Sequence, residues 1–271
     1  MKAKQVLVMG GFDDIRSLDL RFLEEASKLG QLTVSLWPDE LLTMRTGRPP
    51  KFPMVERLYF LNAVRYVSHV VEAGEAVLAD VLSDGHGAQI WADVTTSANT
   101  YREKFCHANR LTYRVFSADE LKGFPEPTHN LPESKGKKVI VTGSFDWFHS
   151  GHVRFLEEVS QHGELYVAVG NDANIRLLKG EGHPLLSQHE RRYVVGSIRC
   201  VRQALISGGS GWLDADQEIQ RLKPDIFAVN EDGDKGGKRE YCEKHGIQYL
   251  VLKRVPAPGL PSRTSTNLRG F

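Results

Sequence analysis

The sequence predicts an α/β fold made of two doubly wound parallel-sheet domains in tandem. Two observations lead to this prediction: short β-branched or aromatic runs alternate with amphipathic stretches, and one unit of about 115 to 135 residues occurs twice. Such alternation is typical of parallel sheets, because a helix must return the chain to the start of the next strand. With 271 residues the chain is long enough for two such domains.

The repeat is clearest where GGFDDIRSLDLRFLEE at residues 10–25 matches GSFDWFHSGHVRFLEE at residues 143–158, an offset of 133 residues. The segment 119–136 is rich in Pro, Gly and charge, which is typical of a linker. The sequence therefore predicts one domain over residues 1–118 and a second over residues 137–271. We expect the fused copies to form an intramolecular pseudo-dimer, because a tandem pair can supply within one chain the contact of a symmetric dimer.

Strands and helices of the second domain follow from its hydrophobic pattern. Five short β-branched or aromatic runs are predicted strands: 137–142, 164–170, 203–207, 225–230 and 248–253. Four amphipathic stretches are predicted helices: 151–162, 188–200, 214–222 and 236–246. Ligands of doubly wound sheets bind at the carboxyl ends of the strands where the strand order reverses, so the first strand-to-helix loop is the predicted binding loop.

That loop combines two glycines with two histidines. Gly143 ends the strand and Gly151 begins the helix, so backbone N–H groups can approach a ligand at the positive end of the helix dipole, which favours phosphate. His149 and His152 are three residues apart, so both rings can face the same space. Imidazole donors there suit the charge that develops on a phosphoryl oxygen. One such histidine alone would more often be a structural cap, and a metal site is disfavoured because no third ligand has suitable spacing.

The first copy of the loop lacks these groups. Arg16 and Asp19 replace the two histidines, and Leu18 replaces the glycine between them. A segment matching TST at the C-terminal end of the second copy is also missing. We therefore predict that the first domain is a catalytically silent copy of the same fold.

Composition and charge exclude several classes of protein. Thirty-five Lys and Arg stand against 34 Asp and Glu, which disfavours a nucleic-acid-binding protein because such proteins carry a large positive footprint. The three cysteines (Cys106, Cys200 and Cys242) are far apart, which argues against a disulfide framework. No leader-like or membrane-length apolar run is visible, so we expect a cytoplasmic protein without a membrane partner.

Residues 137–271 resemble the cytidylyltransferase-like nucleotidylyltransferases, whose first motif is a strand followed by G-[TS]-F-D-x-x-H-x-G-H. GSFD at residues 143–146 and HSGH at residues 149–152 match this motif, and TSTNLR at residues 264–269 stands where the family has S-T-T-x-I. NDANIRLLKGEGHP (171–184) is similar to heptose-phosphate adenylyltransferases. Glu190-Arg191 and the segment 197–199 resemble glycerol-3-phosphate cytidylyltransferases, and the tandem layout is similar to ethanolamine-phosphate cytidylyltransferase.

The resemblance implies the roles of individual residues. Catalytic roles fall on His149, His152, Lys179, Arg191 and Arg199. Nucleotide binding falls on Gly143, Ser144, Phe145, Asp146, Gly151, Thr264, Ser265 and Thr266. The segment PAPGLPSR departs from the family pattern, which leaves open whether Arg254 or Arg263 reaches the triphosphate. Mg²⁺ is expected as the counter-ion of the triphosphate.

The reaction implied joins a nucleoside triphosphate to a phosphorylated small molecule and releases pyrophosphate. We expect first the transfer of CMP from CTP to a small alcohol, polyol or amino-alcohol phosphate, and second the transfer of AMP from ATP to a sugar phosphate. A non-catalytic nucleotide-binding or scaffold protein is the alternative of another class. A class I aminoacyl-tRNA-synthetase-like protein is disfavoured because a KMSKS-like segment and positive charge are missing. The chain is expected to be a monomeric pseudo-dimer or a homodimer.

Overall fold

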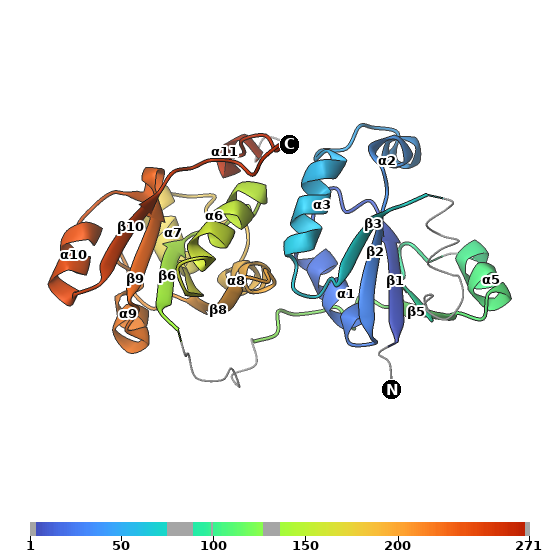
Figure 1. The fold of residues 1–271 in the computed structure, drawn as a ribbon, viewed down its shortest axis with the longest axis horizontal. Helices are drawn as coiled ribbons and strands as arrows, with labels where there is room; N and C mark the ends of the chain where they lie inside the picture. Colours follow the sequence, from blue (N-terminus) through green and yellow to red (C-terminus); the bar gives the residue numbers. More distant parts are fainter. Residues whose placement is uncertain (1–3, 75–88, 99, 127–135, 269–271) are drawn as a thin grey trace. The chain divides into compact units, whose positions relative to one another are not determined.

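The computed structural model describes residues 4–74, 89–98, 100–126 and 136–268 (Figure 1). The chain divides into two compact units, Met1–Gly123 (unit 1) and Phe124–Phe271 (unit 2). The division falls within the predicted linker, of which residues 127–135 lie outside the described part.

Unit 1 is built on a five-stranded sheet with helices in the crossovers. Its strands are β1 (Gln5–Gly10), β2 (Gln31–Leu36), β3 (His69–Glu72), β4 (Ile90–Val94) and β5 (Thr112–Phe116). Its described helices are α1 (Ser17–Ser27), α2 (Asp39–Thr46), α3 (Met54–Ala63) and α5 (Thr100–Ala108). The strand order is β3-β2-β1-β4-β5, and all pairs are parallel.

Unit 2 has a sheet of the same kind. Its strands are β6 (Lys138–Gly143), β7 (Glu164–Val169), β8 (Val201–Ile206), β9 (Ile226–Asn230) and β10 (Gln248–Leu252). Its helices are α6 (Ser150–Ser160), α7 (Asp172–Lys179), α8 (Gln188–Gly196), α9 (Asp216–Leu222), the 3₁₀ turn η1 (Glu231–Gly233), α10 (Lys238–His245) and α11 (Ser265–Leu268). The order β10-β9-β6-β7-β8 is the order of unit 1 read from the other edge, again with parallel pairs.

The prediction of an α/β fold with two parallel sheets is therefore confirmed. Two details of unit 2 differ from the sequence-based prediction. Helix α7 lies in a segment for which no helix was predicted, although the Asn171 side chain caps it by accepting a hydrogen bond from Asn174 N at 2.8 Å. The stretch predicted as a helix over 188–200 ends at Gly196, because β8 already begins at Val201.

The strand order of unit 2 reverses next to its buried central strand, β6. Strand β6 is buried on both faces through Val139, Ile140 and Val141, as expected for a central strand covered by helices. The chain runs from β6 outward through β7 to β8, and then crosses to β9 on the other side of β6. The strand order thus reverses between β6 and β9, whose carboxyl ends are Gly143 and Asn230.

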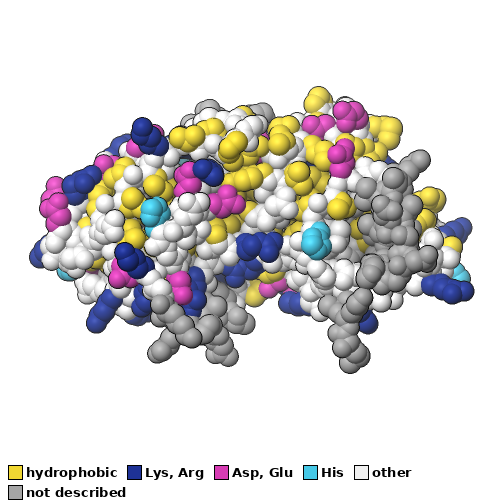
Figure 2. Space-filling view, in the orientation of Figure 1, with side chains coloured by type: hydrophobic (Ala, Val, Ile, Leu, Met, Phe, Trp, Pro, Cys, Tyr) yellow, Lys and Arg dark blue, Asp and Glu magenta, His cyan; other side chains and the backbone are white. Residues whose placement is uncertain are grey.

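The surface matches the balanced composition. Figure 2 shows Lys and Arg interspersed with Asp and Glu on the visible face rather than gathered into one large patch. Among the described residues, no helix has the length and hydropathy needed to cross a membrane.

A buried leucine of α6 provides a test of the unit 2 core. Leu156 is fully buried, so Leu156→Ala should lower the free energy of unfolding of unit 2 by about 2–5 kcal/mol, through lost apolar burial and a residual cavity. Leu177 on α7 is 69% exposed, and Leu177→Ala should change stability by less than about 0.5 kcal/mol. Urea unfolding followed by circular dichroism measures both, and equal losses would contradict this description of the core.

Candidate active site

In the loop after β6, the ring of Phe145 packs against the backbone of Gly143. Phe145 has φ of 49°, in the left-handed region, and its buried side chain folds back under the end of the strand. A Cβ atom at Gly143 would lie 2.9 Å from Phe145 Cε2, so position 143 must be glycine for the loop to adopt this conformation. Gly143 and Phe145 both line a pocket at the end of β6.

Two buried polar side chains anchor this loop to the rest of the unit. Asp146 Oδ1 accepts hydrogen bonds from Leu185 N at 2.7 Å and Leu186 N at 3.1 Å. Arg191 is fully buried, and its guanidinium donates to three acceptors: Ser144 O at 2.6 Å, Leu186 O at 2.9 Å and Asp172 Oδ1 at 2.7 Å. These contacts bind Asp146 and Arg191 to protein groups rather than presenting them to a ligand.

The two histidines lie together at the start of α6. His149 is the N-cap residue, and its Nδ1 accepts a hydrogen bond from Gly151 N at 3.1 Å. The His152 ring lies 4.0 Å from that of His149, centroid to centroid, and stacks on Phe148 at 5.3 Å. A Cβ atom at Gly151 would come within 2.9 Å of His149 Cε1, so the glycine allows the imidazole to lie against the helix N-terminus.

Both imidazoles are held neutral. Burial, followed by the charges of Arg254 and Arg263, lowers the pKa of His149 to about 4. Burial, followed by His149, Arg254 and Lys179, lowers the pKa of His152 well below its usual value. In neutral His149 the ring proton must lie on Nε2, because Nδ1 is the acceptor.

Each ring also has one buried nitrogen without a protein partner. These are His149 Nε2 and His152 Nδ1, and neither forms a hydrogen bond with any described residue. Buried polar groups are rarely left unpaired, so these two nitrogens at the strand-order reversal are candidates to bind a ligand or a water.

A pocket opens beside the His152 ring at the carboxyl ends of β6 and β9. Its lining includes Gly143, Ser144, His152, Asn230, Lys238 and Arg254. Lys238 comes from the start of α10 and is half-buried; burial lowers its pKa, and Asp234 and Asp214 oppose that effect. Lys238 could not be recognised from the sequence, because a lysine in a glycine-rich turn has no spacing that distinguishes it from a surface residue.

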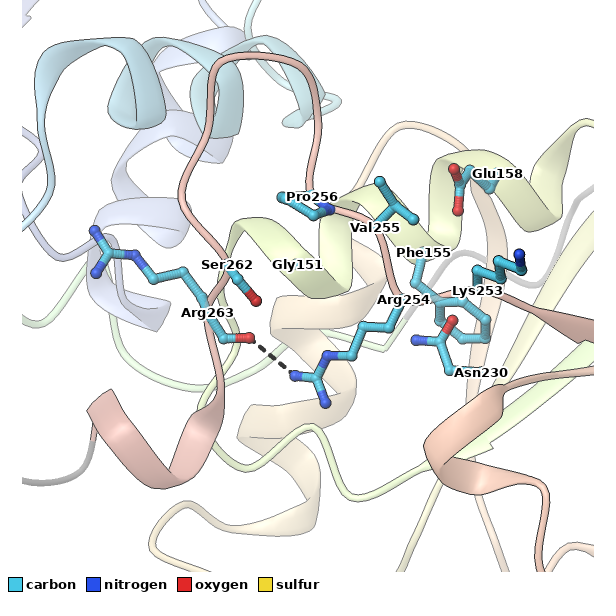
Figure 3. A pocket seen from close by; sticks show the side chains of 10 residues that line it. All are labelled: Gly151, Phe155, Glu158, Asn230, Lys253, Arg254, Val255, Pro256, Ser262 and Arg263. Carbon is cyan, nitrogen blue, oxygen red and sulfur yellow. Dashed lines mark hydrogen bonds between the residues drawn. The ribbon is translucent and has the colours of Figure 1, made fainter.

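Arg254 also lines a second, smaller pocket, which is shown in Figure 3. Its guanidinium donates to Asp232 Oδ2 at 2.5 Å and to the backbone carbonyl of Arg263 at 2.9 Å. In Figure 3 the Arg263 side chain extends away from Arg254, while its carbonyl faces it. Arg254 lines both pockets and Arg263 only the smaller one.

The profile of the cytidylyltransferase-like family matches residues 140–256. An FAD synthase from Ferroglobus placidus is 36% identical over 120 residues, which cover 43% of this chain and 75% of the relative. The chain belongs to the cytidylyltransferase-like family. It is therefore a nucleotidyltransferase, and its substrates include a nucleotide.

Other relatives of this nucleotidyltransferase match over part of their length. A bifunctional protein HldE from Hydrogenovibrio crunogenus is 38% identical over 140 residues, which are 51% of this chain and 26% of that protein. The chain thus spans about a quarter of the HldE relative. The crystal structure of a lipopolysaccharide core biosynthesis protein from Thermoplasma volcanium is 24% identical, covering 45% of this chain and 98% of that one with a TM-score of 0.38.

Of the other residues selected from the sequence, some lie at the loop after β6 and one lies far from it. Lys179 Nζ donates to Ser144 Oγ at 2.8 Å, which places a cation on the loop. Ser265 Oγ donates to Trp147 O at 3.2 Å, so α11 and the preceding Thr264 lie against the same loop. The side chain of Thr266 lies outside the described part.

Arg199 does not lie at the carboxyl ends of the strands, where the pocket is. It is exposed and precedes β8, whereas the loop with the histidines follows β6. Because all strands of unit 2 are parallel, Arg199 lies at the amino ends of the strands, about 20 Å away across a six-residue strand. The distance excludes direct contact of its side chain with a ligand in the pocket.

Unit 1 has different contacts at the matching positions. Arg16 Nη2 donates to Asp14 Oδ2 at 2.8 Å, and Asp19 Oδ2 accepts from Arg16 N at 2.8 Å. Burial raises the pKa of Asp19, with a further contribution from Asp14. Polar groups at the start of α1 are thus paired with one another, whereas at the start of α6 two ring nitrogens have no partner among the described residues.

The low histidine pKa values predict a loss of stability in acid. Below pH 6.5 the unfolded chain binds a proton at His149 that the folded chain binds only near pH 4, and the pKa of His152 is likewise well below its usual value in the folded chain, so acidification favours unfolding. The free energy of unfolding of unit 2 should therefore fall between pH 6.5 and 4, by up to about 1.4 kcal/mol per pH unit for each histidine.

The matched variants isolate this effect. His149→Gln with His152→Gln should make the fall with pH shallower, whereas His162→Gln, at an exposed position, should leave it unchanged. Urea midpoints at pH 7.5, 6 and 5 measure the slopes. Equal slopes for the double variant and the parent would rule out neutral, buried histidines.

Proposed function

We propose that unit 2 transfers a nucleotidyl group from a nucleoside triphosphate to the phosphate of a small-molecule monoester, with release of pyrophosphate. One observation carries this proposal: two buried, neutral imidazoles have unpaired ring nitrogens at the helix start where the strand order reverses. Such a site can receive the oxygen atoms of an α-phosphate, and family membership makes nucleotidyl transfer the reaction class to which this geometry belongs.

The chemistry requires positioning more than acid–base catalysis. An oxygen of the acceptor phosphate attacks the α-phosphorus, the bond from that phosphorus to the bridging oxygen breaks, and pyrophosphate leaves with the electron pair. The attacking oxygen is already anionic, so no base is needed. His149 Nε2–H donates toward an α-phosphate oxygen, where negative charge increases in the transition state, and His152 supports the same group from the adjoining ring.

Cations around the pocket would neutralise the phosphates of both substrates. Lys179, Lys238 and Arg254 have this role in the proposal, because each reaches the loop or lines the pocket. Arg191 acts as a positioning residue that fixes the loop through Ser144 O. Arg199 has no part in the proposed reaction. Ser144, Thr264, Ser265 and Thr266 remain proposed donors to the triphosphate.

ATP is the favoured donor. An FAD synthase makes a product that contains an adenylyl group, and residues 171–184 resemble heptose-phosphate adenylyltransferases, so a flavin phosphate or a sugar phosphate is the favoured acceptor class. CTP with a small alcohol, polyol or amino-alcohol phosphate is the second candidate, because Glu190-Arg191 and the segment 197–199 resemble glycerol-3-phosphate cytidylyltransferases.

Magnesium would enter with the triphosphate rather than on a protein site. Among the described residues, no group of three or more His, Cys, Asp or Glu side chains could hold a metal ion. The Asp146 carboxylate accepts two backbone hydrogen bonds, and Asp232 pairs with Arg254. A cation bound mainly by phosphate oxygens and water fits this donor set, since Mg²⁺ usually retains several waters.

Removal of the histidines tests the proposed reaction. His149→Ala and His152→Ala should each lower kcat by about 10²-fold or more, because each removes a donor to the transition state. His162→Ala is the matched control, at an exposed position of the same unit. Pyrophosphate release is measured with ATP or CTP and with FMN, heptose phosphate, glycerol 3-phosphate or ethanolamine phosphate as acceptor.

The double variant separates the two units. If unit 1 is silent, His149→Ala with His152→Ala should abolish turnover, whereas retained turnover would contradict catalysis in unit 2. Calorimetric titration of ATP and CTP with magnesium into the parent chain provides the independent check. Binding of neither nucleotide would favour the scaffold alternative.

The choice between the two arginines gives a further prediction. Arg254→Gln should raise the KM for the nucleotide about 10- to 100-fold, the loss expected for a charge-assisted hydrogen bond to phosphate. Arg263→Gln should have a smaller effect, because in Figure 3 its side chain extends away from Arg254. Initial rates against nucleotide concentration measure both, and a larger effect at Arg263 would contradict this assignment.

A further inference from the structure

Unit 1 retains a pocket at the position that matches the active-site pocket of unit 2. It lies at the carboxyl ends of β1 and β4, where the strand order of unit 1 reverses, and beside the start of α1. The pocket contains about 990 Å³ of space that no protein atom fills, part of it open to solvent, compared with about 640 Å³ in unit 2. The replacement of the histidines has therefore not closed the site.

The walls of the unit 1 pocket are largely aromatic. Phe12, Phe22, Trp37 and Phe116 line it, and the rings of Phe22 and Phe116 contact each other edge to face at 5.9 Å. Aromatic side chains in a concave site favour a flat, largely apolar ligand that can stack on them.

The charges of this pocket disfavour phosphate. Asp19 stands where unit 2 has His152, and the buried Asp93 also lines the pocket. Arg102 is the only Lys or Arg among the described lining residues, and its guanidinium is paired with the Asp93 carboxylate. Tyr113 also donates to Asp93, at 3.0 Å. A phosphate would thus meet one cation that is already neutralised and two carboxyl groups.

We propose that unit 1 binds a nucleoside or a similar heteroaromatic compound that carries no phosphate. The base would stack between aromatic walls, and its amino groups or the ribose hydroxyls would donate to carboxylate oxygens, as ribose does in other doubly wound sheets. This function is separate from the transfer reaction of unit 2, because it uses the other unit and none of the groups proposed for catalysis.

Two substitutions at the mouth of the pocket provide the test. Leu18 is 59% exposed and Ala118 is exposed, and both line the pocket, so Leu18→Trp and Ala118→Trp can fill it from outside without disturbing the core. Met44→Trp is the matched control, because Met44 is 74% exposed on α2 and does not line the pocket.

Adenosine and cytidine are titrated by calorimetry into the full chain and into each variant. We expect at least one nucleoside to bind, about tenfold more weakly to Leu18→Trp and Ala118→Trp than to the parent chain and to Met44→Trp. Excess ATP should not displace it, since Asp19 and Asp93 oppose a triphosphate. Lack of binding by both nucleosides, equal affinity of Leu18→Trp and Met44→Trp, or displacement by ATP would overturn the proposal.

Discussion

A buried arginine fixes the active-site loop, and the geometry of unit 2 depends on it. Arg191 has no exposed surface, and a buried guanidinium is stable only when its N–H groups find acceptors. It finds them in Ser144 O, Leu186 O and Asp172 Oδ1, which belong to the loop after β6, the segment before α8 and the start of α7. Arg191 thereby holds these three parts of the chain in one arrangement. The positions of His149 and His152 depend on it, because they follow Ser144 on the same loop.

Unit 1 has the same arrangement around a buried arginine, although it lacks the two histidines. Arg57 is equally buried and donates to the carbonyls of Gly11, Phe52 and Trp37 and to the carboxylate of Asp39. Yet α1 there begins with Arg16 and Asp19, whose side chains pair within the unit. The surrounding fold is therefore retained although the side chains at the helix start differ between the two units.

The sequence predicted the fold and the loop because both leave local patterns. Alternating runs indicate parallel sheets, and His149 with His152 three residues apart places two rings at one helix start. The roles of Asp146 and Arg191 could not be predicted in this way, because a buried structural ion and a ligand-binding ion have the same sequence signature. Arg199 was selected because its segment resembles a helix of the family. It precedes β8, however, and therefore lies at the amino ends of the strands, whereas the pocket lies at their carboxyl ends.

The cations in and near the pocket show why the remaining site residues can be identified only once the topology is known. Lys179 ends α7, Lys238 begins α10, and Arg254 follows β10, so about 75 residues separate the first from the last in sequence. Each stands next to the carboxyl end of a strand, either in the crossover that follows it or directly beyond it. Parallel pairing brings the carboxyl ends of the strands to the same side of the sheet, so Lys238 and Arg254 line one pocket and Lys179 reaches Ser144, which also lines it. Spacing in sequence can identify a pair such as His149 and His152, whereas a set assembled across several crossovers becomes visible only when strand order and direction are known.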